Sequence, residues 1–592
     1  MKSLVLLTTV MRHQAAICKV SLERDIRTLE RRYRAEGAHF LEVVLPTLDD
    51  VLLEGLRIGV CPLPEHFHVR GELPVFLGPL WSLVFDEDGI LLSAPSHDAI
   101  TAIRQITRAS KKVFEVCPDD AVAKEISSFL QTDNEVGDYC PPADAIRLLG
   151  IAIDALFGRF LRSTDWGVVE GRHGPGATAE RYDLVGRWDF GPSNPEIASA
   201  FPEPHPPLYS WPYPVFAGRA VGRLVAVPKT ATKPRLISIE PSSHQWIQQS
   251  IKDRLYSMFN GIRVCDLRSQ DPNRILAEIG SYAGCLATID LSEASDRISN
   301  DLVKLVFSRF PQFSGAIQAC RTKWIEVPGH GEYELKKFAS MGSALTFPIE
   351  VMIFTAITLM GVALAEGGEF VSAVRRLAKS DFIRIYGDDI IVPVEHYKPV
   401  TIALEVFGLK VNKGKSFAHG LFRESCGADF FGGSDVAPVY RRRRDPGGPH
   451  DTSEIVSLVS FANQYSDRYG PSPIPDTVHE LLRAWTGLDV SRHPNPSEFG
   501  GLAIVGDPSG NRVRYNRALQ RDEVRAYTLR VASRDSRASD GARLRYALDS
   551  VRGNVVPDDS DVLSAPGVLI PGRTLSHGVS ASTHITTRWV AA

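Results

Sequence analysis

The sequence feature that most restricts the fold is a pair of apolar runs, within residues 382–394, that flank a glycine and two aspartates. Both runs are rich in β-branched residues, and a glycine between two such runs is typical of a tight hairpin turn that needs a positive φ. The pattern predicts a β-hairpin with Gly387, Asp388 and Asp389 at its turn. Adjacent carboxylates repel each other, so we expect a divalent cation to share this site. Magnesium prefers oxygen ligands and commonly joins carboxylates to substrate phosphates.

The hairpin alone does not identify the chemistry, because Gly-Asp pairs also occur in ordinary solvated turns. A third carboxylate is found upstream, where the apolar run 285–289 predicts a buried strand that ends at Asp290. Ser292 and Glu293 then open a predicted helix that extends to Phe310. A strand end beside a hairpin turn can bring carboxylates from distant parts of a sheet to one metal site.

Composition excludes a disordered or fibrous chain. With 592 residues, of which 44% are hydrophobic and 23% charged, the chain resembles a soluble globular protein with several subdomains. Its 67 basic and 70 acidic residues give a net charge of -3, so a nucleic-acid partner would need a local basic channel. The eight cysteines show no spacing typical of a zinc site or a disulfide framework, which favours a reducing cytoplasm.

Two apolar segments must be distinguished from export or membrane signals. The run at residues 1–7 is short and is soon followed by Arg12, and we interpret it as a first strand. The run Phe347–Ala365 approaches the length of a membrane span, but it contains Pro348 and Glu350. We therefore predict a buried core helix there and no association with a membrane.

Basic residues accompany a β-rich stretch at residues 221–239. Lys229, Lys233 and Arg235 lie between or within its two apolar runs. A solvated basic face is the simplest interpretation. The alternative is a phosphate-binding segment, because charge-assisted contacts to phosphate oxygens use lysine and arginine.

These features belong to an ordered series of short motifs. The series consists of residues 227–229, 239–241, 290–296, 340–343, 386–389 and 422–427. In this order it resembles the palm-type RNA-dependent RNA polymerases, and most closely the replicase catalytic beta subunits of single-stranded RNA bacteriophages, the Qβ-like levivirus family. The resemblance covers about residues 173–444, and an ordered set is far more specific than any one motif.

The resemblance implies an α+β fold of the right-hand polymerase type, with an antiparallel palm sheet packed on helices. It divides the chain into an N-terminal region and fingers (1–220), fingers with a basic nucleotide-entry segment (221–284), a palm with the catalytic motifs (285–440), and a thumb with the C-terminal region (441–592). Residues 452–483 have a helical pattern, as expected of a thumb. We interpret the Pro-rich stretch 202–214 as an exposed connection and the polar tail from Ala532 as loosely packed or partner-binding.

The resemblance also implies roles for the acidic residues. Asp290 and Asp388 would bridge two magnesium ions about 3.5–4 Å apart, with manganese able to substitute, and Asp389 would complete the metal shell. Asp296 would recognise the ribose hydroxyls, because a hydrogen-bonding site rejects a nucleotide that lacks its partner. The alternative for Asp296 is an exposed aspartate at a helix start, stabilised by the helix dipole.

Basic side chains would act on the phosphates. By the same resemblance, Lys229, Lys233 and Arg235 would hold the incoming triphosphate. Lys415, with Lys413 as the alternative, would protonate the departing pyrophosphate or orient the triphosphate.

Three further segments complete the implied site. Ser343 and Thr346 would contact the ribose or Asp296, and a capped helix start is the structural alternative for both. Residues 423–440 resemble the element that grips the primer end. The four arginines 441–444 would hold product phosphates, or they form a solvated charge run.

The implied activity is template-directed addition of ribonucleotides to an RNA 3′ end, during replication of a phage genome in the cytoplasm of an infected bacterium. The implied partners are RNA template and product, NTPs, host elongation factors Tu and Ts, and a ribosomal protein that binds single-stranded RNA. Two alternatives remain open. Gly387 and Asp296 argue against a reverse transcriptase, and the three acidic positions with the basic segment argue against a non-catalytic RNA-binding scaffold.

Overall fold

The structure is a computed structural model of mixed helical and strand content. It describes residues 2–113, 117–174, 176–181, 186–189, 195–201, 204–205, 219–230, 232–531, 543–544 and 583–591. Most of the predicted connection at 202–214, and most of the tail from Ala532, therefore lie outside the described residues.

A three-stranded antiparallel sheet lies at the centre of the fold, with the strand order β11–β12–β7. It consists of β11 (Arg384–Tyr386), β12 (Asp389–Pro393) and β7 (Leu286–Ile289). Successive side chains of a strand point to opposite faces. Accordingly, Ile390 and Val392 join the main core, whereas Ile391 packs with residues of α10 (Asp271–Ala283). The expected antiparallel sheet packed on helices is present.

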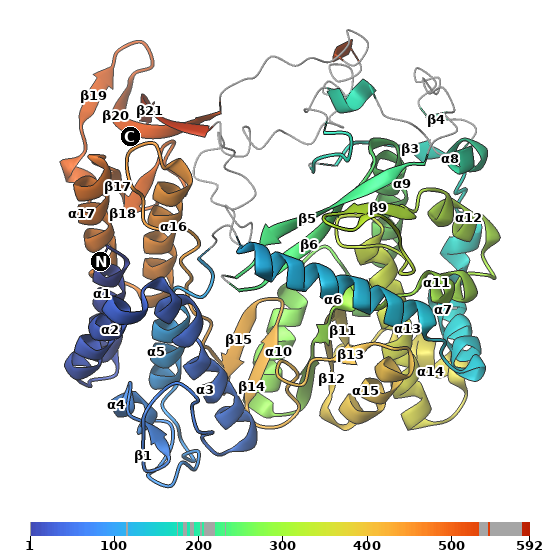
Figure 1. Cartoon of the computed structure of the whole chain (residues 1–592), viewed down its shortest axis with the longest axis horizontal. Coiled ribbons are helices and arrows are strands. Elements are labelled where there is room, and N and C mark those ends of the chain that lie inside the picture. The colour runs from blue at the N-terminus through green and yellow to red at the C-terminus, as the bar shows by residue number, and fades with distance from the viewer. Residues whose placement is uncertain are drawn as a thin grey trace.

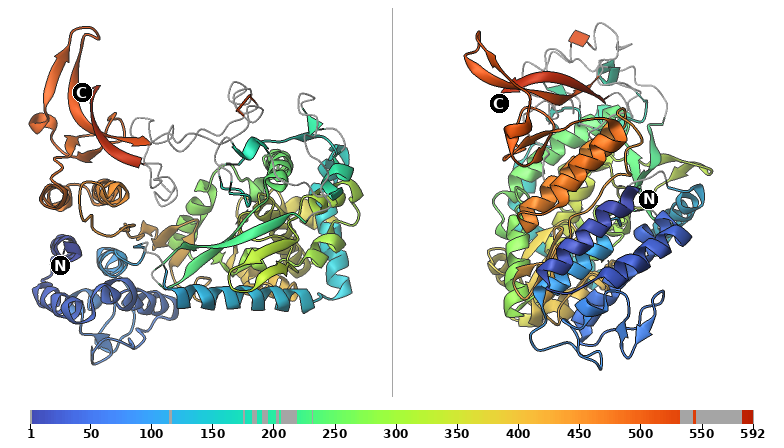
Figure 2. Two further views of the ribbon diagram at one scale, coloured as in Figure 1. Left: turned by 45° about the horizontal axis from the view of Figure 1, so that its top comes forward. Right: turned by 90° about the vertical axis from the view of Figure 1, so that its left-hand side faces the viewer.

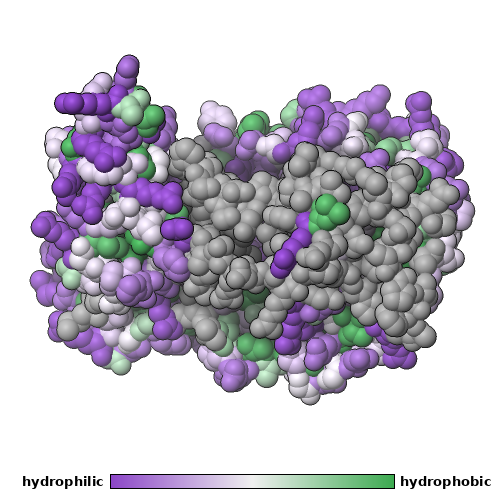
Figure 3. Space-filling model, turned by 90° about the horizontal axis from the view of Figure 1, so that it is seen from above, coloured by the Kyte–Doolittle hydropathy of each residue, from purple (hydrophilic) through white to green (hydrophobic). Residues whose placement is uncertain are grey.

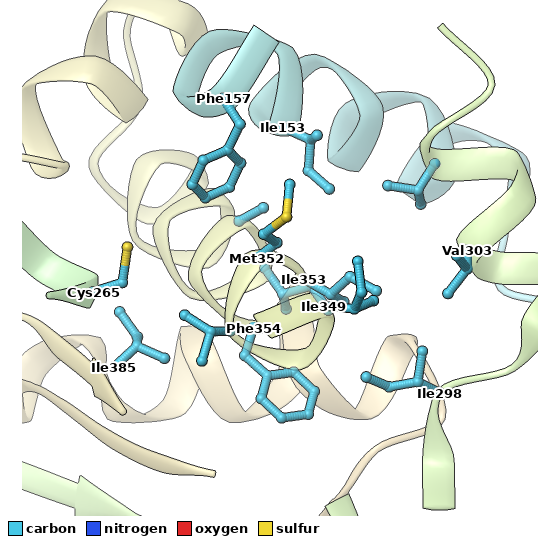
Figure 4. Close-up of a cluster of buried hydrophobic side chains, with 14 of the residues drawn as sticks. Ile153, Phe157, Cys265, Ile298, Val303, Ile349, Met352, Ile353, Phe354 and Ile385 are labelled. Atoms are coloured by element: carbon cyan, nitrogen blue, oxygen red, sulfur yellow. The ribbon is translucent and has the colours of Figure 1, made fainter. Parts of the chain in front are cut away.

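The main core surrounds α13 (Thr346–Glu366), whose side chains radiate toward several elements (Figure 4). Ile349 and Ile353 face Ile298 and Val303, and Phe354 and Ile385 of the central sheet belong to the same core. Within the described residues α13 is the one helix long and apolar enough to cross a membrane, and 89% of its apolar window is buried. A helix that is apolar on all sides belongs in a protein core or a bilayer. The prediction of a buried core helix is confirmed.

A second sheet has the order β10–β9–β5–β6. Its strands are β5 (Val221–Pro228), β6 (Pro234–Ile239), β9 (Trp324–Val327) and β10 (Gly331–Glu334), with β5 and β9 parallel. The long helix α6 (Asp119–Asp138) crosses in front of β5 and β6 (Figure 1). Ile126 and Phe129 of α6 pack on Leu224 and Ile325 of this sheet.

Helices from both ends of the chain form a second large core. α1 (Lys2–Ile17), α2 (Glu23–Glu36), α3 (Thr47–Ile58), α4 (Gly78–Trp81) and α5 (His97–Arg108) pack with α16 (Thr452–Tyr469) and α17 (Ile474–Thr486). Figures 1 and 2 show these N-terminal and C-terminal helices side by side. The Tyr465 hydroxyl accepts a hydrogen bond from the Gln14 amide at 2.8 Å, so α1 is also tied to α16 by a polar contact.

The prediction of a first strand at residues 1–7 is wrong, because this segment begins α1. Leu4, Leu7 and Met11 are buried on one side of the helix, and Arg12 is exposed. This spacing of three and four residues is that of an amphipathic helix. The helical spacing becomes visible only when residues beyond position 7 are included.

The remaining elements complete the scaffold. The helices are α7 (Ala143–Ser163), α8 (Pro195–Ala200), α9 (Ser242–Phe259), α11 (Asn300–Val306), α12 (Pro311–Ala319), α14 (Phe370–Leu377) and α15 (Tyr397–Val406), with a π-helical turn at Phe40–Val44 and 3-10 turns at Gly186–Asp189, Arg263–Cys265, Ala294–Arg297, Val394–His396 and Pro508–Gly510. The strands are β1 (Val69–Arg70), β2 (Leu73–Pro74), β3 (Val169–Glu170), β4 (Pro204–His205), β8 (Leu291–Ser292), β13 (Lys410–Val411), β14 (Phe422–Ser425), β15 (Ala428–Phe431), β16 (Ser434–Asp435), β17 (Ser491–His493), β18 (Ala503–Val505), β19 (Val513–Asn516), β20 (Arg521–Val531) and β21 (Thr583–Ala591). Seen from above, the part of the molecule that carries β19–β21 shows mostly hydrophilic side chains (Figure 3).

Candidate active site

The predicted hairpin is present and brings the three aspartates toward one edge of the central sheet. Gly387 has a φ of 64°, and a Cβ added there would lie 2.6 Å from the Phe347 ring, so both the turn and its packing require glycine. β12 and β7 pair with Ile390 opposite Ile289. Asp290 follows Ile289 and Asp389 precedes Ile390, so both adjoin this end of the two strands, and the exposed Asp388 at the turn acts electrostatically on both.

Asp290 is held by a segment that follows α15. The Asn412 amide donates to Asp290 Oδ2 at 2.8 Å, and the Asp290 backbone N–H donates to the Ser416 hydroxyl at 3.1 Å. Burial, opposed by the nearby Lys415 ammonium and reinforced by the Asp388 and Glu424 carboxylates, raises the pKa of Asp290 to about 7. This carboxyl is therefore fixed in position and lacks enough positive charge to be fully ionised at neutral pH.

Asp389 is held from the other side by the turn between β14 and β15. Its Oδ1 accepts the Cys426 backbone N–H at 3.0 Å and the Ser425 hydroxyl at 3.3 Å. Burial and the neighbouring Asp388 charge raise the pKa of Asp389 to about 6. Asp290 and Asp389 both have raised pKa values, and the Asp388 carboxylate acts on both of them. The three carboxyls therefore form a site with too little positive charge.

The acidic residues offer the oxygen donors that magnesium requires. Within the described part of the chain, no three His, Cys, Asp or Glu side chains already stand together as a set of metal ligands. The carboxyl groups of Asp290 and Asp389 nevertheless have raised pKa values because burial and the charge of Asp388 disfavour their ionised forms. A divalent cation would remove this penalty, and oxygen donors suit magnesium. The donor chemistry fits the ion.

A basic group faces the acidic one. Lys229, Lys233 and Arg235 lie at the end of the β5–β6 hairpin, where Val227 pairs with Arg235. Burial and the nearby positive charges of Arg235, Lys415 and Lys233 lower the pKa of Lys229, and Asp290 opposes that shift. Lys229 therefore lies in electrostatic contact with Arg235, with Lys233 and with the acidic site, while Lys233 Nζ also lies 3.6 Å from Glu125 of α6.

Of the two candidate lysines, Lys415 is the one placed at the acidic site. Its Nζ lies 3.8 Å from Glu424 Oε1, and the charges of Glu424 and Asp290 raise the pKa of Lys415. Lys413 is exposed two residues earlier on the same loop. The charge of Lys415 also lowers the pKa of Asp290, so Lys415 interacts electrostatically with the acidic site.

Asp296 lies on a turn and not on the predicted helix. Residues 294–297 form a 3-10 turn, and α11 begins only at Asn300, where the Ser299 hydroxyl accepts the Leu302 N–H at 3.0 Å. The helix prediction from Ser292 to Phe310 is therefore wrong in this part. Ser299 is a good N-cap and starts a new helix because its side chain satisfies a free backbone donor.

A buried lysine that sequence reasoning missed holds Asp296 in place. Lys337 is fully buried, and its Nζ donates to Asp296 Oδ1 at 2.9 Å and lies 3.9 Å from Asp133. It also lies 3.4 Å from the centre of the Phe129 ring. The Asp296 side chain remains 29% exposed. The alternative of a free, solvated aspartate at a helix start does not describe this residue.

The chain around Lys337 is clamped from two sides. Asp133 of α6 accepts the backbone N–H groups of Lys336 and Lys337 at 2.9 Å each. The buried Arg321 guanidinium donates to the carbonyls of Leu335, Lys337 and Phe338 at 2.5–2.8 Å. Such two-sided backbone clamps fix a side chain more firmly than packing alone.

The hydroxyl of Thr346 serves the local fold. It donates to the Ser340 carbonyl at 2.7 Å and is buried, which matches the capped-start alternative. Ser343 Oγ accepts the Leu345 N–H at 3.3 Å. The residue after Thr346, Phe347, packs edge-on against Tyr386 with ring centres 5.4 Å apart, so this loop lies beside the β11–β12 hairpin.

Other site residues escaped sequence reasoning as well. Asn412, Ser416 and Cys426 hold the aspartates through single hydrogen bonds, and Glu350 of α13 is a buried carboxyl whose pKa burial raises well above its usual value. Asn412 and Ser416 stand on either side of Lys415, which was the only available signal. Isolated polar residues of this kind belong to no repeating sequence pattern by which they could be predicted.

With this geometry established, the chain can be compared with known proteins. Residues 214–447 match the family described as "RNA replicase, beta-chain". The chain is 35% identical over 332 residues to the RNA-directed RNA polymerase subunit beta of Enterobacteria phage SP, which covers 56% of this chain and 54% of that one. It is 36% identical over 284 residues to the RNA-directed RNA polymerase beta chain of Escherichia phage MS2, which covers 48% and 47%.

The central part of this chain is related to the phage replicase beta chains. The resemblance inferred from the ordered motifs is thereby confirmed. The chain spans about half the length of the curated relatives it matches. The solved RNA-dependent RNA polymerase of bacteriophage phi12 is also similar, at 12% identity over 75% of this chain and 76% of that one, with a TM-score of 0.39.

Proposed function

We propose that this protein is an RNA-dependent RNA polymerase that replicates the genome of a single-stranded RNA phage. One observation carries the proposal: β7 and β12 end together at Ile289 and Ile390, so Asp290 and Asp389 adjoin the same end of the sheet, with Asp388 at the adjacent turn and Lys229 near Asp290. The printed names of the relatives support the same activity. Phosphoryl transfer relies mainly on alignment and charge neutralisation, which such an arrangement provides.

We propose that the fold is a right-hand polymerase. The central sheet with its carboxylates would be the palm within residues 285–440, the β5–β6 sheet and α6 would belong to the fingers, and α16 and α17 to a thumb. Residues 4–109 share a core with residues 417–504, which indicates that the N-terminal helices support the thumb side.

The residues divide into three roles in this proposal. Asp290 and Asp388 would hold magnesium, with Asp389 beside them, and the bound metal would supply charge neutralisation at the triphosphate and acidify the attacking 3′-hydroxyl. Lys229 and Arg235 would bind the triphosphate through charge-assisted hydrogen bonds. Lys415 would donate a proton toward the departing pyrophosphate.

Ribose recognition would fall to Asp296. Its Oδ1 is engaged by Lys337, and within the described residues Oδ2 has no hydrogen-bond partner and remains partly exposed. An acceptor in this state suits a ribose hydroxyl. Rejection of a deoxynucleotide would follow, because the carboxylate would then lose its partner.

Primer extension on an RNA template with magnesium tests the proposal. Asp388→Asn should abolish nucleotide addition while RNA binding survives, because a metal ligand is lost and the fold is not. Asp381→Asn is the matched control, since Asp381 is exposed, precedes the same hairpin and pairs only with Arg263 in the described structure. Normal polymerisation by the Asp388 variant would overturn the assignment.

The nucleotide and partner alternatives can be separated experimentally. Preference for dNTPs over NTPs would favour a reverse transcriptase, and RNA binding without any extension would favour a scaffold. We further propose that the protein acts in the bacterial cytoplasm with elongation factors Tu and Ts and a ribosomal RNA-binding protein. Capture of the tagged chain from infected cells, followed by mass spectrometry, would test these partners.

A further inference from the structure

A second concentration of positive charge lies beside the acidic site, around the ring of Tyr440. The Nζ of Lys112 is 3.9 Å from the ring centre, and the Cζ atoms of Arg442 and Arg108 are 5.4 and 5.9 Å away. The aromatic ring attracts each of the three cations, but the cations repel one another.

The nearby acidic groups are already engaged. Asp49 accepts Arg104 at 3.0 Å and Arg108 at 2.7 Å, and Asp429 accepts Arg104 at 2.8 Å. Glu424 faces Lys415 at 3.8 Å. Across the described residues, neither Lys112 nor Arg442 has an acidic partner within 4 Å.

Lys112 and Arg442 are thus two half-buried cations with no ion pair among the described residues, and the more distant Asp429 and Glu424 offset only part of the repulsion at Lys112. Burial and the charges of Arg442 and Arg108 lower the pKa of Lys112 to about 7. Burial also lowers the pKa of Arg442. Keeping such a pair close together disfavours the protein alone, and an anionic ligand would remove that penalty.

The location relates this site to the proposed chemistry. Lys112 follows α5 and Tyr440 lies between β16 and α16, so the site joins the N-terminal helices to the segment that leads into α16. Glu424 links the two sites, because it affects the pKa of both Lys112 and Asp290.

We propose that Lys112, Arg442 and the Tyr440 ring bind a backbone phosphate of an RNA strand as it passes the acidic site. The inference rests on the proposed polymerase function for its choice of ligand. Lysine and arginine contact phosphate oxygens by charge-assisted hydrogen bonds, and the Tyr440 ring holds the two cations beside each other. The negative charge of a phosphodiester would offset the positive charge of Lys112 and Arg442.

RNA binding as a function of salt tests the proposal without any catalysis. Fluorescence anisotropy with a labelled single-stranded RNA is measured in the Asp388→Asn background, without NTPs or metal. Each lost phosphate contact reduces the slope of log K against log salt by about 0.7 for a single strand. We expect Lys112→Ala and Arg442→Ala each to reduce the slope by that amount, and Lys112→Arg to restore it.

Lys111→Ala is the matched control, because Lys111 is the adjacent residue and faces Asp50 at 3.5 Å. Its slope should equal that of the parent protein. Equal slopes for the Lys111 and Lys112 variants would overturn the proposal. So would a Lys112 variant that binds RNA normally but loses affinity for ATP, which would make the site one for a nucleotide triphosphate. Because no step of synthesis is measured, failure of the polymerase assignment would leave this result interpretable.

Discussion

Lys337→Met should weaken the discrimination between ribonucleotides and deoxyribonucleotides. The substitution keeps an apolar chain of similar length against Phe129 but removes the ammonium that lies 2.9 Å from Asp296. A hydrogen bond to a charged group contributes about 1.5–3 kcal/mol. If Asp296 is free to turn away, part of this energy is lost from ribose recognition.

We expect the ratio of kcat/KM for NTP over dNTP to fall roughly tenfold or more, since about 1.4 kcal/mol corresponds to a factor of ten. Stability should fall less than the 3–5 kcal/mol typical of a broken buried pair, because Asp296 is 29% exposed and can be hydrated, while the buried Asp133 keeps hydrogen bonds from the Tyr333 hydroxyl and the Lys336 and Lys337 N–H groups. Single-nucleotide incorporation kinetics with matched NTP and dNTP measure the ratio, and thermal melting measures the stability.

Two further variants separate positioning from general loosening. Arg297→Met removes the ion pairs of this 3-10-turn residue with the partly exposed Glu293 and Glu135, but leaves the Lys337–Asp296 contact, and should preserve the ratio. In an Asp296→Asn background, Lys337→Met should have no further effect on discrimination. An equal effect of Lys337→Met in both backgrounds would refute the reasoning, because the lysine would then not act through Asp296.

Three other outcomes follow from the site. Gly387→Ala should lower the melting temperature by several degrees, because the new Cβ would meet the Phe347 ring; Gly367→Ala, also at positive φ but with open space, should lower it less. In EDTA, thermal stability should fall as pH rises from about 4 to about 7. The pKa of the Asp290 carboxyl is about 7 in the folded state and its usual value is 3.8, so the folded state binds a proton that the unfolded state has already lost. Asp290→Asn should flatten this profile, and an unchanged profile would contradict the assigned pKa. Asn412→Ala removes a hydrogen bond that lowers the pKa of Asp290, so the acidic limb of the pH–rate profile should move to higher pH, and a limb that stays in place would show that Asn412 does not stabilise the carboxylate.

The catalytic hairpin and the partner strand could be predicted because local patterns determine them. Alternating β-branched residues and a glycine that needs a positive φ fix the turn, and the apolar run before Asp290 ends at the same edge of the sheet. The carboxylates therefore meet through strand register, which sequence patterns report well.

The supports of the site could not be predicted, because they depend on contacts between distant segments. Lys337 reads as one surface lysine among many, yet α6 and Arg321 enclose it completely. The helix after Asp296 was predicted too early because Ser292 and Glu293 also fit a helix start, whereas the observed cap is Ser299. Both Ser292 and Ser299 fit a helix start locally, and tertiary packing determines which of them is used.

The shared core of the two chain ends has a consequence for biosynthesis. Apolar faces of α1–α5 find their partners in residues 417–504, so a ribosome must translate several hundred codons before this core can close. Contacts so distant along the chain form slowly, and the nascent helices remain exposed to chaperones and proteases in the meantime. A nonsense mutation before α16 should therefore release a polypeptide in which residues 4–109 expose apolar surface, aggregate readily and are rapidly degraded.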